Sequence, residues 1–392
     1  MNKYYVLIVF CVTIFSCDDS GLPNNKAKIK TVKSYEYTKT ETTKSLGDKD
    51  NIIAEKLDDL FTQQYKSGLF NGSVLVAKAD RVLFKKSFGL QNKSSRFFLT
   101  DSSMFQLASV SKIITSTAIL LLHERNLIDL NKNFNFYFPD FPYSNISIKS
   151  LLCHRSGLAN YIYVLNKELY LSDYKMSNHD MYNYFVSKKP APYLKPDKRF
   201  NYSNTNYALL ALLVEKITKI TFSDFLRKEF FKPLGMKHTA TINEIDLNGK
   251  NITKPYDCRW HTIDFDASDY VLGDKSIYST PYDMYLFSKA LYENKLINSE
   301  SQALAYTAYS KERKTNNYGF GWRIKNFKDS LKKEVYHNGW WHGYRSSFHR
   351  RLRDTLTVVI FSNQLNYSAY HTNKVYEIID NEIISETVEE LE

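Results

Sequence analysis

Strand-forming segments occupy both ends of the chain, and helix-forming segments occupy the middle. The first two strand-rich runs, 73–77 and 81–88, are joined by a turn around Asp80. Between the two ends, apolar residues recur at helical spacing, and more strand-rich runs return only after residue 320. The helical segments are 110–127, 207–217, 222–231 and 284–292, and the late strands are 321–324, 335–337, 346–349 and 355–361. This order predicts an α+β fold in which both ends of the chain build one antiparallel sheet.

Two further amphipathic segments, 51–65 and 375–384, flank the sheet pattern and predict helices at both ends. We therefore expect an α+β lobe from residues of about 51–140 and 270–392, with a mainly helical lobe of about 141–269 inserted into it. Together these residues, 51–392, make one predicted domain.

The first 16 residues have the pattern of an export signal. Lys3 precedes an apolar run, 6–15, that is shorter than the roughly 20 residues a membrane-spanning helix needs. Such a run is typical of the apolar region of a secretory signal. The run ends in Ile-Phe-Ser-Cys, which resembles a bacterial lipobox and implies that Cys17 becomes a lipidated first residue.

From this resemblance we expect residues 1–16 to be a lipoprotein signal peptide, with plain secretion as the alternative. The polar segment 17–50 lacks apolar periodicity and is typical of a flexible tether. The expected location is the bacterial cell envelope, on the outer membrane or the periplasmic face, with membrane attachment through lipid on Cys17.

The charge of the chain is basic but not concentrated. Lys and Arg number 53 against 42 Asp and Glu, a formal net charge of +11, yet no long basic block or zinc-finger spacing occurs. We therefore predict no nucleic-acid partner, and keep a basic surface for anionic polymers as an alternative function. No His-Glu-x-x-His motif is present, so we expect no metal and no organic cofactor. Pairing of Cys153 with Cys258 and the oligomeric state stay open.

Ser109 and Lys112 stand at the start of the most apolar predicted helix. Their spacing of three residues places them on one helix face. Apolar surroundings and the positive helix end disfavour an ammonium ion, so Lys112 can accept a proton from Ser109. An ordinary capping serine is the simpler interpretation. The same Ser-x-x-Lys pattern recurs at Ser172 and Ser330, but neither copy begins a long apolar helix.

Two later motifs supply partners for this pair. Tyr202-Ser-Asn204 precedes another apolar helix; its phenol can relay protons and its amide can hydrogen-bond the lysine and a substrate carbonyl. His337-Asn-Gly339 lies on a predicted strand, where the glycine lets a substrate backbone approach closely. The N–H of the next residue, Trp340, is a candidate oxyanion donor beside that of the serine.

In this order the motifs resemble those of the serine β-lactamase and penicillin-binding superfamily. The chain is most similar to its branch of class C β-lactamases, D,D-peptidases and family VIII esterases, over roughly residues 70–365. Longer segments carry the same resemblance: 105–109, 151–158, 279–283, 318–322 and 337–344. Two departures are Pro196-Asp197, where the family has Pro-Gly, and Gly273-Asp-Lys-Ser, where the family is rich in glycine.

The resemblance implies the β-lactamase/transpeptidase-like fold and a serine hydrolase that works through an acyl-enzyme. Ser109, Lys112 and Tyr202 take the catalytic roles, and Asn204, His337, Gly339 and Trp340 contact the substrate. Ester, amide or D-amino-acid peptide substrates are expected. Because His337 replaces the lysine of most β-lactamases in this branch, we expect at most weak β-lactamase activity. A catalytically inactive envelope binding protein is the alternative.

Overall fold

The computed structural model describes residues 47–165, 174–311, 316–326, 328 and 333–389. All of these residues belong to one compact unit, which spans 37–392. Cys17 and the predicted signal and tether segments before residue 47 lie outside the described residues. In the part of the chain that is described, no helix is both long enough and apolar enough to cross a membrane.

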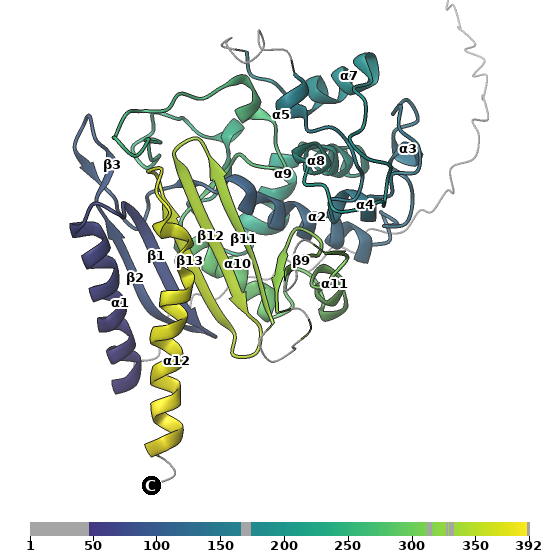
Figure 1. Ribbon diagram of the computed structural model, residues 1–392. Coiled ribbons are helices and arrows are strands. Elements are labelled where there is room, and N and C mark those ends of the chain that lie inside the picture. The colour runs from purple at the N-terminus through teal and green to yellow at the C-terminus, as the bar shows by residue number, and fades with distance from the viewer. Residues whose placement is uncertain (1–46, 166–173, 312–315, 327, 329–332, 390–392) are drawn as a thin grey trace, which may run out of the picture. The chain divides into compact units, whose positions relative to one another are not determined.

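An antiparallel sheet of eight strands joins the two ends of the chain (Figure 1). Its order is β2-β1-β13-β12-β11-β10-β9-β8. The strands are β1 (Gly72–Lys78), β2 (Arg81–Phe88), β8 (Ser310–Lys311), β9 (Asn316–Tyr318), β10 (Arg323–Lys325), β11 (Glu334–Trp341), β12 (Tyr344–Arg351) and β13 (Leu356–Ser362). The pairing of β1 with β13, with Val74 opposite Ile360, makes the sheet continuous. The α+β prediction is therefore confirmed, with the sheet built from both termini.

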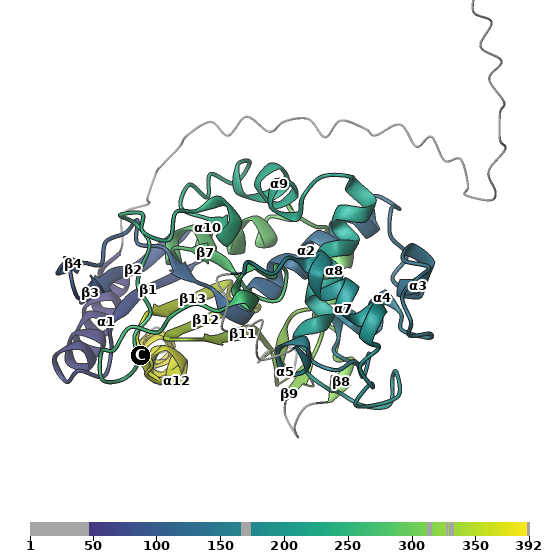
Figure 2. The same ribbon diagram turned by 90° about the horizontal axis from the view of Figure 1, so that it is seen from above.

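Helices cover both faces of this sheet (Figure 2). The terminal helices α1 (Asp48–Lys66) and α12 (Thr372–Glu389) pack on one face. Side chains alternate between the faces of a strand, so Val74 and Val76 of β1 point toward these helices while Leu75 and Ala77 join the core on the other side. Burial on both faces explains why β1 and β13 are apolar throughout.

The second face of the sheet carries the larger core and the helical lobe. Its helices and turns are η1 (Ala108–Val110), α2 (Ser111–Glu124), α3 (Phe134–Tyr137), α4 (Ile148–Leu152), α5 (Tyr161–Val164), α7 (Asn178–Lys188), α8 (Asn204–Thr218), α9 (Phe222–Leu226), η2 (Arg227–Phe231), η3 (Ile242–Glu244), η4 (Ala267–Tyr270), α10 (Pro281–Tyr292) and α11 (Ser299–Ala305). Helix α8 lies centrally and contacts α2, α4, α7 and α9. Short strands complete the unit: β3 (Leu90–Asn92), β4 (Phe97–Phe98), β5 (Phe105–Gln106), β6 (Ala240–Thr241) and β7 (Ile277–Ser279).

Several predicted boundaries differ from the structure for physical reasons. The predicted helix 222–231 is α9 followed by the wider turn η2. The predicted strand 321–324 begins later, because Gly321 has a φ of +79° and its α-carbon packs against the Lys112 carbonyl of α2. Strand β11 continues past His337 to Trp341, since Asn338 and Gly339 keep extended pairing with β12. Cys153 is buried, Cys258 is exposed, and the two are not joined.

Neighbouring isoleucines of α1 test how far this helix stabilises the sheet. Ile53 is buried in the core between α1 and the sheet, whereas Ile52 is 40% exposed. We expect Ile53→Ala to lower the free energy of unfolding by about 2–5 kcal/mol, because it removes buried methyl groups and leaves a cavity. The matched Ile52→Ala should change it by less than about 1 kcal/mol. Chemical denaturation measures both, and equal effects would contradict the assigned packing.

Candidate active site

Ser109 sits in the turn η1, directly before the first residue of α2. This turn is fixed by its neighbours: the Leu107 N–H donates to the Ile277 carbonyl of β7, and the Ser346 hydroxyl of β12 donates to the Leu107 carbonyl. Ala108 has a φ of +48°, a left-handed conformation that costs energy for a residue with a Cβ. The partly exposed Ser109 is therefore presented by a strained and firmly held turn.

Lys112 is completely buried one helical turn after Ser109. Its Nζ lies 3.2 Å from Ser109 Oγ, 2.8 Å from Asn204 Oδ1 and 2.7 Å from the Asp274 carbonyl oxygen. Burial lowers the pKa of Lys112 to about 7, the Asp274 carboxylate opposes that shift, and Arg323 adds to it. At neutral pH a large fraction of this amine is uncharged. Its two hydrogens then satisfy Asn204 and Asp274, and its lone pair faces the Ser109 hydroxyl.

Tyr202 approaches the same serine from the loop before α8. Its hydroxyl lies 2.9 Å from Ser109 Oγ, and Lys112 Nζ stands 5.1 Å from the centre of its ring. The buried ring of His154 packs 4.2 Å from that of Tyr202. His154 Nδ1 accepts from the Ser203 N–H, and burial holds the pKa of His154 well below its usual value. His154 thus supports Tyr202 as a neutral ring.

Strand β11 brings the third motif to this group. Gly339 packs so closely on η1 that a Cβ on it would lie 2.4 Å from the Leu107 carbonyl oxygen. Strand β10 pairs only with residues 334–336, so 337–341 keep a free edge on that side among the described residues. A free edge beside a nucleophile allows an extended substrate to pair with it. The oxyanion roles of the Ser109 and Trp340 N–H groups stay predictions.

His337 is held as a neutral ring. Its Nδ1 lies 2.7 Å from the Asn338 carbonyl, which can only accept, so Nδ1 carries the proton. The other ring nitrogen, Nε2, accepts from the Tyr318 hydroxyl at 3.0 Å. Burial, with Arg323 and Lys112 nearby, keeps the pKa of His337 well below its usual value. A neutral His337 supplies no positive charge to a substrate carboxylate.

The structure adds residues that sequence motifs did not single out. The Asp274 carboxylate is buried beside Lys112 and accepts from the Tyr161 hydroxyl at 3.1 and 3.3 Å. The ammonium of Lys275 is also buried, and it donates to Tyr161 and lies 4.9 Å from the Trp341 ring centre. The departure of segment 273–276 from the glycine-rich family pattern was the only sequence signal for this group.

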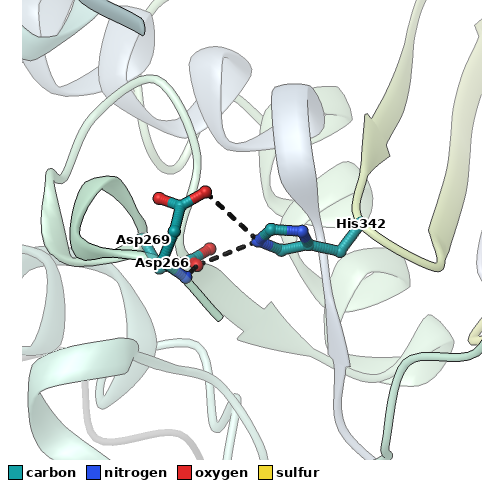
Figure 3. Close-up of side chains that lie close together, drawn as sticks. All are labelled: Asp266, Asp269 and His342. Atoms are coloured by element: carbon teal, nitrogen blue, oxygen red, sulfur yellow. Dashed lines mark hydrogen bonds and ion pairs between the residues drawn. The ribbon is translucent and has the colours of Figure 1, made fainter. Parts of the chain in front are cut away.

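Asp266, Asp269 and His342 lie close together where the turn after β11 meets η4 (Figure 3). His342 Nε2 is 2.9 Å from one Asp269 oxygen, and the Trp341 indole N–H donates to the other. The Asp266 N–H also donates to Asp269. Because protein donors already occupy both Asp269 oxygens, the cluster ties the β11–β12 turn to η4.

The three catalytic candidates and Asn204 thus converge on one point, with Gly339 against the adjoining turn. A comparison with known families matches the Beta-lactamase model over residues 56–380. The chain belongs to the beta-lactamase family.

Curated relatives and solved structures agree with this assignment. The chain is 29% identical over 333 residues to penicillin-binding protein 4* of Bacillus subtilis, covering 80% of this chain and 72% of that protein. It is 26% identical over 347 residues to the teichoic acid D-alanine hydrolase of Staphylococcus aureus, covering 83% and 84%. The crystal structure of a penicillin-binding protein from Bacillus halodurans superposes with a TM-score of 0.70 at 22% identity, covering 82% and 98%. The predicted superfamily and the β-lactamase/transpeptidase-like fold are confirmed, and the relatives support a hydrolase.

Gly339 offers a steric test of the β11–η1 contact. We expect Gly339→Ala to lower the free energy of unfolding by about 1–3 kcal/mol, since the new methyl overlaps the Leu107 carbonyl and Ser346 Oγ. Displacing the strand should also slow the reaction of Ser109 with a fluorophosphonate about tenfold or more. Gly47→Ala, at a glycine with nothing within 4 Å, is the control. Unchanged stability and labelling in Gly339→Ala would contradict the contact.

The protonation of Lys112 predicts the pH dependence of acylation. Because the neutral amine is the base, the acylation rate should rise with pH through about 7. The Asp274 carboxylate favours the ammonium form, so Asp274→Asn should lower the pKa further and move this rise to lower pH. Rates of fluorophosphonate labelling from pH 5 to 9 measure the shift, with the exposed Asp59→Asn as control. A rise that stays in place, or moves to higher pH, would contradict the assigned role of Asp274.

Proposed function

We propose that this protein is a serine hydrolase that cleaves an ester, an amide or a D-amino-acid peptide through an acyl-enzyme on Ser109. One observation carries the proposal: Ser109 Oγ lies within hydrogen-bond distance of both the Tyr202 hydroxyl and the fully buried Lys112 amine, whose pKa is about 7. A capping serine requires neither a buried lysine nor a phenol beside its hydroxyl. A nucleophile requires a base and a proton relay at this distance.

The reaction follows from this geometry in two halves. Ser109 Oγ attacks the substrate carbonyl while its proton passes to neutral Lys112, and the backbone N–H groups of Ser109 and Trp340 stabilise the oxyanion. Tyr202 passes a proton to the departing oxygen or nitrogen as the C–O or C–N bond breaks. Water then attacks the ester on Ser109 and gives up its proton to the same groups, which releases the acid and restores the serine.

The relatives narrow the choice of substrate. One curated relative is named a teichoic acid D-alanine hydrolase and another a penicillin-binding protein, which points to D-amino-acid esters and peptides of the cell envelope. Asn204 is placed to bind a substrate carbonyl, because its amide oxygen already holds Lys112 and its nitrogen stays available as a donor. The neutral His337 disfavours efficient turnover of β-lactams, so β-lactams would be weak substrates or acylating inhibitors.

Two other functions predict different behaviour. A catalytically inactive envelope binding protein would hold ligands without a covalent bond, but it has no need of the Ser109, Lys112 and Tyr202 arrangement. A basic surface for anionic polymers would bind in a strongly salt-dependent way and independently of Ser109. We also propose that lipid on Cys17 anchors the protein in the bacterial cell envelope, on the basis of the lipobox-like segment 14–17.

Covalent labelling of Ser109 tests the function directly. The intact mass of the protein should rise by one adduct with a fluorophosphonate probe, and Ser109→Ala should abolish the adduct. The same variant should lower the hydrolysis of D-alanyl esters at least about a thousandfold, because the nucleophile is lost.

Ser111→Ala is the matched control, since Ser111 Oγ is buried two residues away and has no hydrogen-bond partner. It should keep both the adduct and the hydrolysis. Undiminished hydrolysis in Ser109→Ala would overturn the assignment. Folded wild-type protein without an adduct would favour the inactive binding protein.

A further inference from the structure

Arg345 of β12 lies beneath a group of aromatic rings. Its side chain is only 5% exposed, and its guanidinium stands 4.9 Å from the Trp340 ring centre, 5.8 Å from Tyr367 and 6.0 Å from Tyr370. Trp340 is its cross-strand neighbour on β11. Tyr370 closes the short turn η5 (Ser368–Tyr370), which precedes α12. We name these four residues the arginine box.

The charge of Arg345 has no matching anion in the described structure. The buried Nε has no hydrogen-bond partner, and Nη1 makes one long contact of 3.5 Å to the Tyr344 carbonyl. Among the described residues no carboxylate forms an ion pair with it. A buried cation without a partner is costly, because it loses its hydration and gains nothing in exchange. Aromatic faces offset only part of that cost.

The other arginines of the same strand show the ordinary arrangement. Arg351 pairs with both Asp354 and Asp380. Arg350, which is fully buried, donates to the Tyr306 and Ser288 hydroxyls. Arg345 is therefore distinct within β12: it is buried like its neighbours, yet its Nε is left for a ligand.

The arginine box adjoins the strand segment that lines the active site. The Tyr370 hydroxyl donates to the Gly339 carbonyl at 2.6 Å, and the α-carbon of Gly339 packs on η1 beside Ser109. Trp340 itself belongs to the free edge 337–341. His337, the other basic residue of this segment, is a neutral ring. Positive charge beside the free edge of β11 is thus supplied by Arg345.

We propose that the arginine box is a subsite for an anionic group of the substrate, a carboxylate or a phosphate. The subsite rests on the proposed hydrolase function and names the substrate feature that function selects. Trp340 and Tyr367 are 65% and 72% exposed, so their rings can move aside without disturbing the core. An anion between them would accept from Nε and from the Nη groups of Arg345 in the forked arrangement that guanidinium favours.

Binding of small anions tests the subsite without catalysis. Benzoate and phenyl phosphate should bind the full-length protein and change its tryptophan fluorescence through Trp340, whereas benzyl alcohol should bind at least about tenfold more weakly. Arg345→Gln should remove that preference, and Arg345→Lys should retain part of it, because lysine keeps the charge but not the fork. The exposed Arg353→Gln is the matched control. A preference for benzoate over phenyl phosphate, or the reverse, identifies the anion.

Kinetics tests whether substrates use the same site. Two series of aryl esters carry the carboxylate or phosphate on the acyl half or on the leaving half, each beside a neutral parent. In one series, the ratio of kcat/KM for anionic over neutral ester should fall about tenfold or more in Arg345→Gln. Thermal unfolding and labelling of Ser109 establish that each variant is folded.

The outcomes separate the two proposals. Anion binding that depends on Arg345 in a protein without esterase activity would uphold the subsite and overturn the hydrolase. Esterase activity with unchanged anion ratios and unchanged anion binding in Arg345→Gln would overturn the subsite alone. An equal loss for anionic and neutral esters would make Arg345 structural and would likewise overturn the subsite.

Discussion

The burial of one lysine organises the active site. Lys112 reaches Ser109 on its own helix, Asn204 at the start of α8 and the Asp274 carbonyl of a third segment, so its amine joins parts of the chain far apart in sequence. A buried ammonium needs hydrogen-bond acceptors on every side, and the uncharged amine needs fewer. Because the site satisfies both forms, the lysine can exchange a proton without rearrangement of the fold.

The sheet holds the substrate edge against that lysine. Strand β11 is placed by its pairing with β12 and by the close contact of Gly339 with η1, while Asp269 ties the turn beyond it to η4. Ridged contacts on one face and the α12 packing on the other leave the strand little freedom. A rigid edge next to the nucleophile orients a substrate before reaction, which lowers the entropic part of the barrier.

Charge in this region is placed by environment rather than by residue type. His337 occupies a motif position that holds a cation in many relatives, yet burial and the Asn338 carbonyl keep it neutral. Arg345 lies outside every motif and keeps its charge beneath exposed rings. The Asp274 carboxylate moderates the effect of burial on Lys112. Selectivity for anionic substrates would therefore reside in the pairing of β11 with β12, not in the third motif.

The sequence by itself determined the sheet from both termini and the convergence of Ser109 with Lys112, because strand and helix periodicities are properties of neighbouring residues. It also placed Tyr202 before a buried helix. Only the tertiary structure decided the neutral state of His337 and the unmatched charge of Arg345. Burial and ion pairing depend on segments that meet only after folding, and no local pattern encodes which distant carboxylate is present or absent.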